Sequence, residues 1–110
     1  MAYSDHQADR IRQRLHGSGR VEEKEMMGGL AFMLNGHMCM GLNKDRTTGE
    51  DRLMIRVDKD RYEELLKMKG CREMDFTGKP MRGFLFVYPE GFDLDADLDF
   101  WKEQAIVFNR

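Results

Sequence analysis

Three residues of this sequence, His37, Cys39 and Cys71, carry side chains that can bind a metal ion or attack a substrate. On a strand, residues two positions apart point to the same face, so His37 and Cys39 would lie together. Imidazole and thiolate are typical zinc ligands, and Cys71 would supply a third. However, no C-x-x-C, H-x-x-x-H or H-E-x-x-H pattern accompanies them. The sequence therefore favours a histidine at a hairpin edge beside a small buried cysteine over a metal site or a Cys–His nucleophile pair.

An acidic run imitates a calcium-binding loop. Its carboxylates alternate over Asp93, Asp95, Asp97 and Asp99. An EF-hand loop needs a glycine where this chain has Leu98 and a closing glutamate where it has Gln104. Acidic residues at the start of a helix explain the run without calcium, because they interact favourably with the helix dipole.

The segment 75–82 carries the remaining polar candidates. Thr77-Gly78-Lys79 is a fragment of a phosphate-binding loop, but the rest of that motif is missing. Asp75, Lys79 and Arg82 could form a polar site beside the next strand, or they could be solvated charges on an ordinary loop, which is the favoured interpretation. The sequence predicts no catalytic residue, no cofactor and no metal.

Methionine is unusually frequent, with 10 residues in the chain. Met33, Met38 and Met40 lie close to a turn at Asn35-Gly36. Because methionine is flexible and polarisable, it suits both an adaptable binding surface and the filling of a core. Both interpretations stay open, and the three methionines are interaction candidates.

Hydrophobic periodicity predicts the elements that position these residues. Ser4 has the spacing of a helix N-cap, and Asn35-Gly36 between two apolar runs is typical of a type I′ hairpin. The expected order is a helix over 4–16, an edge strand or loop over 21–27, strands over 30–34, 37–40 and 51–57, a helix over 58–70, a strand over 83–88 and a final helix. This order of elements, α-β-β-β-α-β(β)-α, predicts an α+β two-layer sandwich with an antiparallel sheet and helices.

Length and charge exclude several classes of protein. The 110 residues correspond to one domain, 1–110, and the formal net charge is −2. That charge argues against direct nucleic-acid binding, whose only local support is Arg10, Arg12, Arg14, Lys79 and Arg82. No apolar run suggests a membrane span and the N-terminus has no signal-peptide core, so we expect a cytoplasmic protein.

Two segments resemble a known family. Residues 26–39, MMGGLAFMLNGHMC, resemble the M-F-G-G-L-A-F-M-x-N-G-x-M-C stretch of the TfoX/Sxy N-terminal domain family, with Met27 where an aromatic residue is usual. Residues 74–84, MDFTGKPMRGF, resemble its M-D-F-T-G-[RK]-P-M-[RK]-G-[FY] stretch. The resemblance extends over essentially the whole chain.

The resemblance implies a bacterial α+β domain of the secretion-chaperone-like kind. It also implies a regulatory role in competence and transcription, together with a C-terminal domain that we do not expect in this chain. The family supplies no established catalytic residue. The leading hypothesis is a non-enzymatic protein-interaction module, with a small-molecule-binding or enzymatic domain as the alternative. A homodimer, formed through an edge strand or a methionine surface, stays open.

Overall fold

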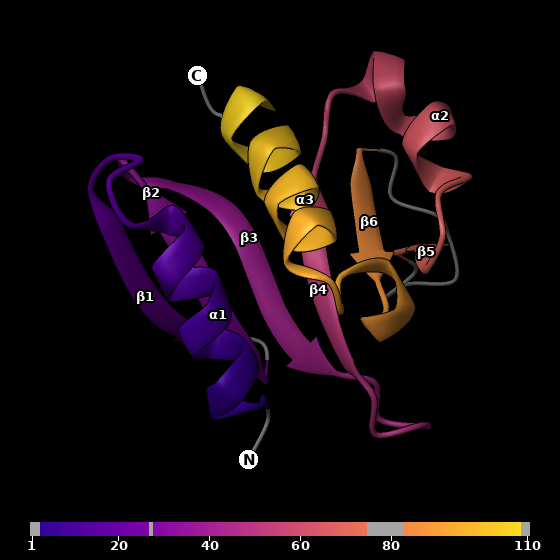
Figure 1. Ribbon diagram of the computed structural model, residues 1–110, viewed down its shortest axis with the longest axis horizontal. Helices are drawn as coiled ribbons and strands as arrows, with labels where there is room; N and C mark the ends of the chain where they lie inside the picture. Colours follow the sequence, from indigo (N-terminus) through magenta and orange to yellow (C-terminus); the bar gives the residue numbers. More distant parts are fainter. Residues whose placement is uncertain (1–2, 27, 75–82, 109–110) are drawn as a thin grey trace.

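The computed structural model describes residues 3–26, 28–74 and 83–108. Helix α1 (Asp5–Leu15) is followed by strands β1 (Val21–Met26), β2 (Gly29–Leu34), β3 (His37–Lys44) and β4 (Asp51–Arg56) (Figure 1). A 3₁₀ turn (Lys59–Arg61) leads into the short helix α2 (Tyr62–Leu66). The remaining elements are β5 (Cys71–Glu73), β6 (Phe84–Val87), a 3₁₀ turn (Pro89–Gly91) and helix α3 (Asp95–Phe108).

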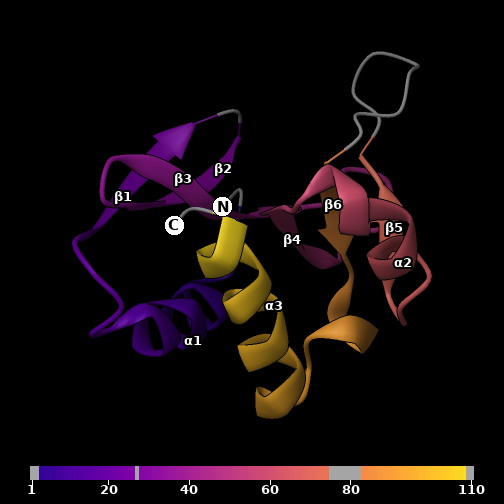
Figure 2. The ribbon, with the colours of Figure 1, turned by 90° about the horizontal axis from the view of Figure 1, so that it is seen from above.

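The six strands form one antiparallel sheet in the order β1-β2-β3-β4-β6-β5. Helices α1 and α3 lie on the same side of it (Figure 2), and α2 packs beside β5. The predicted α+β class is confirmed. The observed order α-β-β-β-β-α-β-β-α has one strand more before α2 than predicted, because the charged segment Val21–Met26 pairs along the whole of β2.

The β2–β3 hairpin forms as predicted, but it contains an irregularity. Asn35 and Gly36 both have positive φ values, 52° and 88°, as a type I′ turn requires. The register shifts between Phe32 and Met33, so that Cys39 is an extra residue between the pairs Met33–Met38 and Phe32–Met40. Such a bulge lets two successive residues share one face, and both Cys39 and Met40 belong to the core under the helices.

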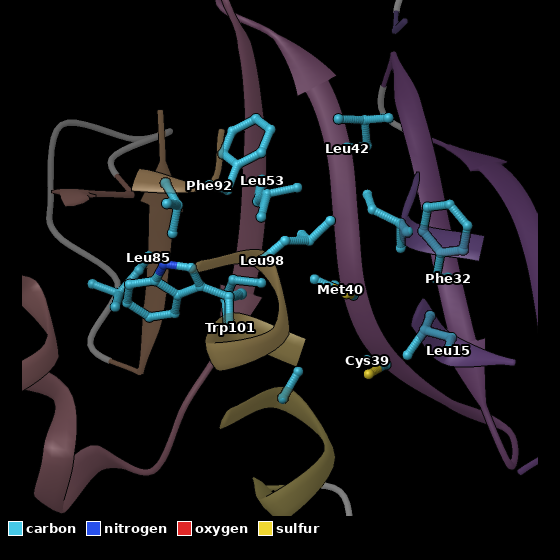
Figure 3. Close-up of a cluster of buried hydrophobic side chains, with 14 of the residues drawn as sticks. Leu15, Phe32, Cys39, Met40, Leu42, Leu53, Leu85, Phe92, Leu98 and Trp101 are labelled. Atoms are coloured by element: carbon cyan, nitrogen blue, oxygen red, sulfur yellow. The ribbon is translucent and has the colours of Figure 1, made fainter. Parts of the chain in front are cut away.

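Apolar side chains at helical spacing fix α1 and α3 to the sheet. Trp101 donates its indole N–H to the Gly91 carbonyl oxygen over 3.1 Å, so its polar atom is satisfied inside the core. Leu98 and Trp101 of α3 face the strands in Figure 3. The helix residues of this core are Ala8, Ile11, Leu15, Leu98, Trp101 and Ala105, and the strand residues include Phe32, Met40, Leu42, Leu53, Ile55, Leu85 and Val87. Within the described ranges, no helix is long and apolar enough to span a membrane.

Arginines of α1 hold the segment that precedes α3. Arg10 donates to the carbonyl oxygens of Phe92 and Asp93, both over 3.0 Å. Arg14 forms an ion pair with Asp95 at 2.9 Å, and hydrogen bonding and charge from the two arginines lower the pKa of that carboxyl. Arg10 and Arg14 are therefore engaged within the fold.

A close approach of two backbones sets the position of the segment before α3. Gly70 has φ +81°, and a Cβ added there would lie 2.7 Å from the Gly91 nitrogen. The Gly70 carbonyl oxygen accepts a hydrogen bond from the Tyr88 nitrogen over 2.8 Å. The Gly70–Gly91 approach thus fixes where β6 ends.

We predict that Gly70→Ala destabilises the fold at least twice as much as Gly49→Ala. Gly49 is a matched control, since its φ is +77° but an added Cβ would meet nothing within 4 Å. Gly49→Ala should therefore show only the cost of the left-handed backbone, about 1 kcal/mol. Thermal and urea unfolding of both variants measure the difference, and equal losses of stability would contradict a tight contact at Gly70.

Candidate functional site

The sheet face opposite α1 and α3, here called the open face, is covered by no described helix (Figure 2). Strand alternation makes it a second apolar surface: Leu85 and Val87 of β6 enter the main core, and Phe84 and Phe86 point the other way. The aromatic residues of β6 pack there with Met74 and Met54, and Tyr88 continues the cluster beyond the strand.

Three arginines lie over these aromatic rings. The guanidinium carbon of Arg52 is 3.8 Å from the centroid of Phe86, and that of Arg72 is 4.0 Å from the centroid of Tyr88. Arg56 lies over Phe84 at 5.6 Å. We call these six residues the arginine–aromatic row. A guanidinium that stacks on a ring can keep its edge N–H groups for a carboxylate or a phosphate.

A polar network anchors one end of the row. The Tyr88 hydroxyl donates to Asp45 over 2.5 Å and accepts from Arg52 over 3.1 Å. Arg52 also donates to the side-chain oxygen of Asn43 over 2.9 Å and forms an ion pair with Asp45 at 3.7 Å. The Nε and Nη1 donors of Arg52 are thus used inside the fold, where they fix the β3–β4 connection to Tyr88 after β6.

The Asp45 carboxyl is the acceptor at the centre of this network. Besides Tyr88, it accepts from the backbone N–H groups of Thr47 and Thr48. The Tyr88 hydrogen bond, followed by that of Thr47, holds the pKa of Asp45 below its usual value. Burial, followed by the hydrogen bond to Asp45, raises the pKa of Tyr88. Asp45 is therefore ionised at neutral pH, with its negative charge already compensated.

A hollow adjoins the network where β3 and β4 are connected. Its volume is about 710 Å³, and it is lined by Gly28, Asn43, Lys44, Asp45, Arg46, Thr47 and Arg52. Lys44 and Arg46 are exposed and form no ion pair with any carboxylate in the described part of the chain. Because the Asp45 carboxylate already accepts hydrogen bonds within the fold, Lys44 and Arg46 give the hollow a positive lining.

The two faces of the sheet carry opposite charge. By strand register, the Asp, Glu, Lys and Arg residues of the strands on the open face are Glu22, Lys24, Arg52, Arg56 and Arg72, and Glu22 is paired with Arg20. Those on the helix face are Glu23, Glu25, Lys44, Asp51 and Glu73. The open face is therefore cationic, although the whole chain has a net charge of −2.

The predicted interaction residues are divided between the two faces. Met33 and Met38 are partly exposed and pair directly across β2 and β3 on the open face. Met40 has no exposed surface and belongs to the core, because the bulge at Cys39 turns it toward the helices. It is therefore core filler in this structure and no contact residue. Asp75, Lys79 and Arg82 lie outside the described residues.

Residues 13–108 match the TfoX N-terminal domain. The chain belongs to the TfoX N-terminal domain family. No curated protein matches it. A crystal structure of a protein from Pseudomonas syringae, a Northeast Structural Genomics Consortium target, is similar with a TM-score of 0.71 over 93% of this chain and 97% of that chain. Its sequence identity is 11%, so the likeness shows the fold alone.

The cysteines of this TfoX N-terminal domain are not built for reaction chemistry. Burial raises the pKa of Cys39 to about 11 and that of Cys71 to about 12, so both stay protonated thiols at neutral pH. Cys39 faces the core, whereas His37 is exposed at the end of the hairpin. No group of three His, Cys, Asp or Glu residues able to hold a metal is found among residues 3–26, 28–74 and 83–108.

Sequence reasoning missed the arginine–aromatic row and its anchor at Asp45. A signal for part of it was present: Phe84, Phe86 and Tyr88 alternate with Leu85 and Val87, which marks a strand with two apolar faces. Arg52 and Arg56 likewise alternate with buried residues of β4. What the sequence could not supply is the strand order that brings β5 and its Arg72 next to β6.

We predict that Tyr88→Phe lowers the free energy of unfolding by about 1 kcal/mol at neutral pH. It removes the hydroxyl that contacts Asp45 and keeps the ring under Arg72, so the pKa of Asp45 should rise toward its ordinary value. A carboxyl with a depressed folded pKa stabilises the fold above its unfolded pKa and loses that contribution as the pH falls through the folded pKa. The difference in free energy of unfolding between Tyr88→Phe and the wild type should therefore become smaller as the pH falls.

Carboxyl NMR titration and thermal unfolding at several pH values measure both effects. Tyr3→Phe is the matched control, because the Tyr3 hydroxyl donates to Glu25 at an exposed position away from Asp45. An unchanged Asp45 titration in Tyr88→Phe would show that the network does not control this carboxyl.

Proposed function

We propose that this domain is a non-enzymatic protein-interaction module that contacts its partner through the open face. The observation that carries the proposal is that one sheet face, covered by no described helix, carries both the partly exposed pair Met33–Met38 and the arginine–aromatic row. Flexible methionines on one surface with arginines and aromatic rings are a composition typical of protein interfaces.

The middle of the open face supports contact with another protein surface. Gly41 of β3 has no side chain, and Met54 of β4 lies across it, so that an added Cβ would be 3.0 Å from the Met54 methyl group. Ala31 of β2 is the partner of Gly41 in the register. Ala31 and Gly41 are buried, so a partner would meet the partly exposed Met54 side chain at this point of the face.

A regulatory role in transcription or competence is the setting that the family resemblance implies for such a module. In this proposal the domain acts as an accessory that binds a regulatory protein. Identification of the bound partner tests the setting: a transcription regulator would support it, and a metabolic enzyme would contradict it.

We predict that a photo-reactive residue at position 38 cross-links the domain to its partner in cells, and that one at position 94 does not. Leu94 is a suitable control because it is 64% exposed and precedes α3, away from the open face. With the partner purified, Met38→Asp should weaken binding about tenfold, about 1.4 kcal/mol, while Leu94→Asp leaves it unchanged. Equal cross-linking from both positions, or undiminished binding by Met38→Asp, would contradict the proposal.

A small anionic molecule is the second candidate ligand, because the hollow at the β3–β4 connection has a positive lining. We predict that a metabolite bound there at a hundred times its dissociation constant adds about 2.7 kcal/mol to the free energy of unfolding. A thermal-shift screen with phosphorylated and carboxylated metabolites measures this. Arg46→Gln should abolish any shift, and a shift that survives this substitution would place the ligand elsewhere.

A further inference from the structure

We infer that the open face recognises an acidic segment of a partner protein, with carboxylates bound by Arg72 and by Arg46 of the adjoining hollow. This inference rests on the proposed function and adds the chemistry of the partner. The site is the path from the hollow, through Arg52 and Tyr88, to Arg72.

Arg72 is the residue best placed to bind a carboxylate. It is exposed on the edge strand β5, and its guanidinium lies over the Tyr88 ring at 4.0 Å. It forms no ion pair with a described carboxylate, unlike Arg52, whose donors reach Asn43 and Tyr88 and whose charge is opposed by Asp45. Stacking on the ring restricts the side chain beforehand, so less conformational entropy is lost when a carboxylate binds its fork of N–H groups.

The hollow supplies the second point of attachment. Lys44 and Arg46 line it, and Arg52 forms its boundary with the arginine–aromatic row. Arg52 touches the Tyr88 hydroxyl, and Arg72 covers the ring of the same tyrosine. An extended segment with several carboxylates could therefore contact the hollow and Arg72 together.

The same geometry favours an acidic peptide over a single-stranded nucleic acid. Sheet surfaces that bind single strands use exposed aromatic rings as stacking platforms. Here Phe86 and Tyr88 are only 5% and 4% exposed, and arginines lie over them. A long phosphate chain would also extend beyond the cationic face toward a protein of net charge −2, whereas a short acidic segment would not.

The experiment measures the binding of three fluorescent probes to the full chain by anisotropy. The first is a twelve-residue peptide of alternating glutamate and leucine, the second has glutamine in place of glutamate, and the third is single-stranded DNA of similar charge. We expect the acidic peptide to bind at least tenfold more tightly than the other two. Its affinity should fall as salt is raised, because the contacts are exposed ion pairs.

Variants of the protein then locate the site. Arg72→Gln should weaken the acidic peptide about fivefold or more, and Arg46→Gln should weaken it as well. Lys67→Gln is the matched control, since Lys67 is an exposed cation at the end of α2 that forms no ion pair within the described residues. Thermal unfolding of each variant establishes that it is folded. Arg72→Lys keeps the charge without the planar fork, and a smaller but measurable loss is expected.

Two results would overturn the inference: DNA binding as tight as that of the acidic peptide, or equal affinity of Arg72→Gln and Lys67→Gln. Its failure is distinguishable from failure of the proposed function. If Met38→Asp weakens binding of the purified partner while Arg72→Gln does not, the domain is an interaction module, but its partner is not recognised through an acidic segment. If the acidic peptide binds through Arg72 while cross-linking at position 38 yields no partner, the acidic-peptide site is supported and the proposed contact of a partner through Met38 is contradicted.

Discussion

The four inner strands of this sheet, β2, β3, β4 and β6, have to offer apolar side chains to the same two helices. Phe32, Met40, Leu53 and Leu85 come from four strands and meet α1 and α3 on one face (Figure 3). Because side chains alternate along a strand, this requirement fixes half of the positions and leaves the other half free to differ. The aromatic cluster, the methionine pair and the arginines all use this second set of positions, and their arrangement depends on the first.

The bulge at Cys39 shows how strictly that requirement acts. Met38 and Met40 would share a face on a regular strand, since they are two residues apart. One extra residue between them moves Met40 into the core and leaves Met38 on the open face. The same residue type thus fills space at one position and offers a contact surface at the other, according to the local backbone.

Much of the fold could be predicted because its signals are local. The Ser4 cap, the Asn35-Gly36 turn and the alternation of Leu53, Ile55 and Val57 each depend on a few neighbouring residues, and each is found in the structure. The candidate site could not be predicted in this way, because Asp45, Arg72 and Tyr88 come from three separate segments. Their meeting depends on the insertion of β6 between β4 and β5, an order that no short-range pattern encodes. Net charge could not reveal the cationic face for a related reason, since it sums two faces of opposite sign.

The exposed edge of β1 has a consequence for how copies of this domain behave when concentrated. An unpaired strand edge invites the addition of another strand, which is the usual beginning of aggregation. If two copies of β1 paired antiparallel about Lys24, the two Lys24 side chains would lie opposite each other and Glu23 would lie opposite Glu25 on both sides of them. At the other edge, β5 offers only three residues. Growth of the sheet from copy to copy is thus discouraged at both margins, which leaves the broad surface between them as the accessible place for a partner to approach.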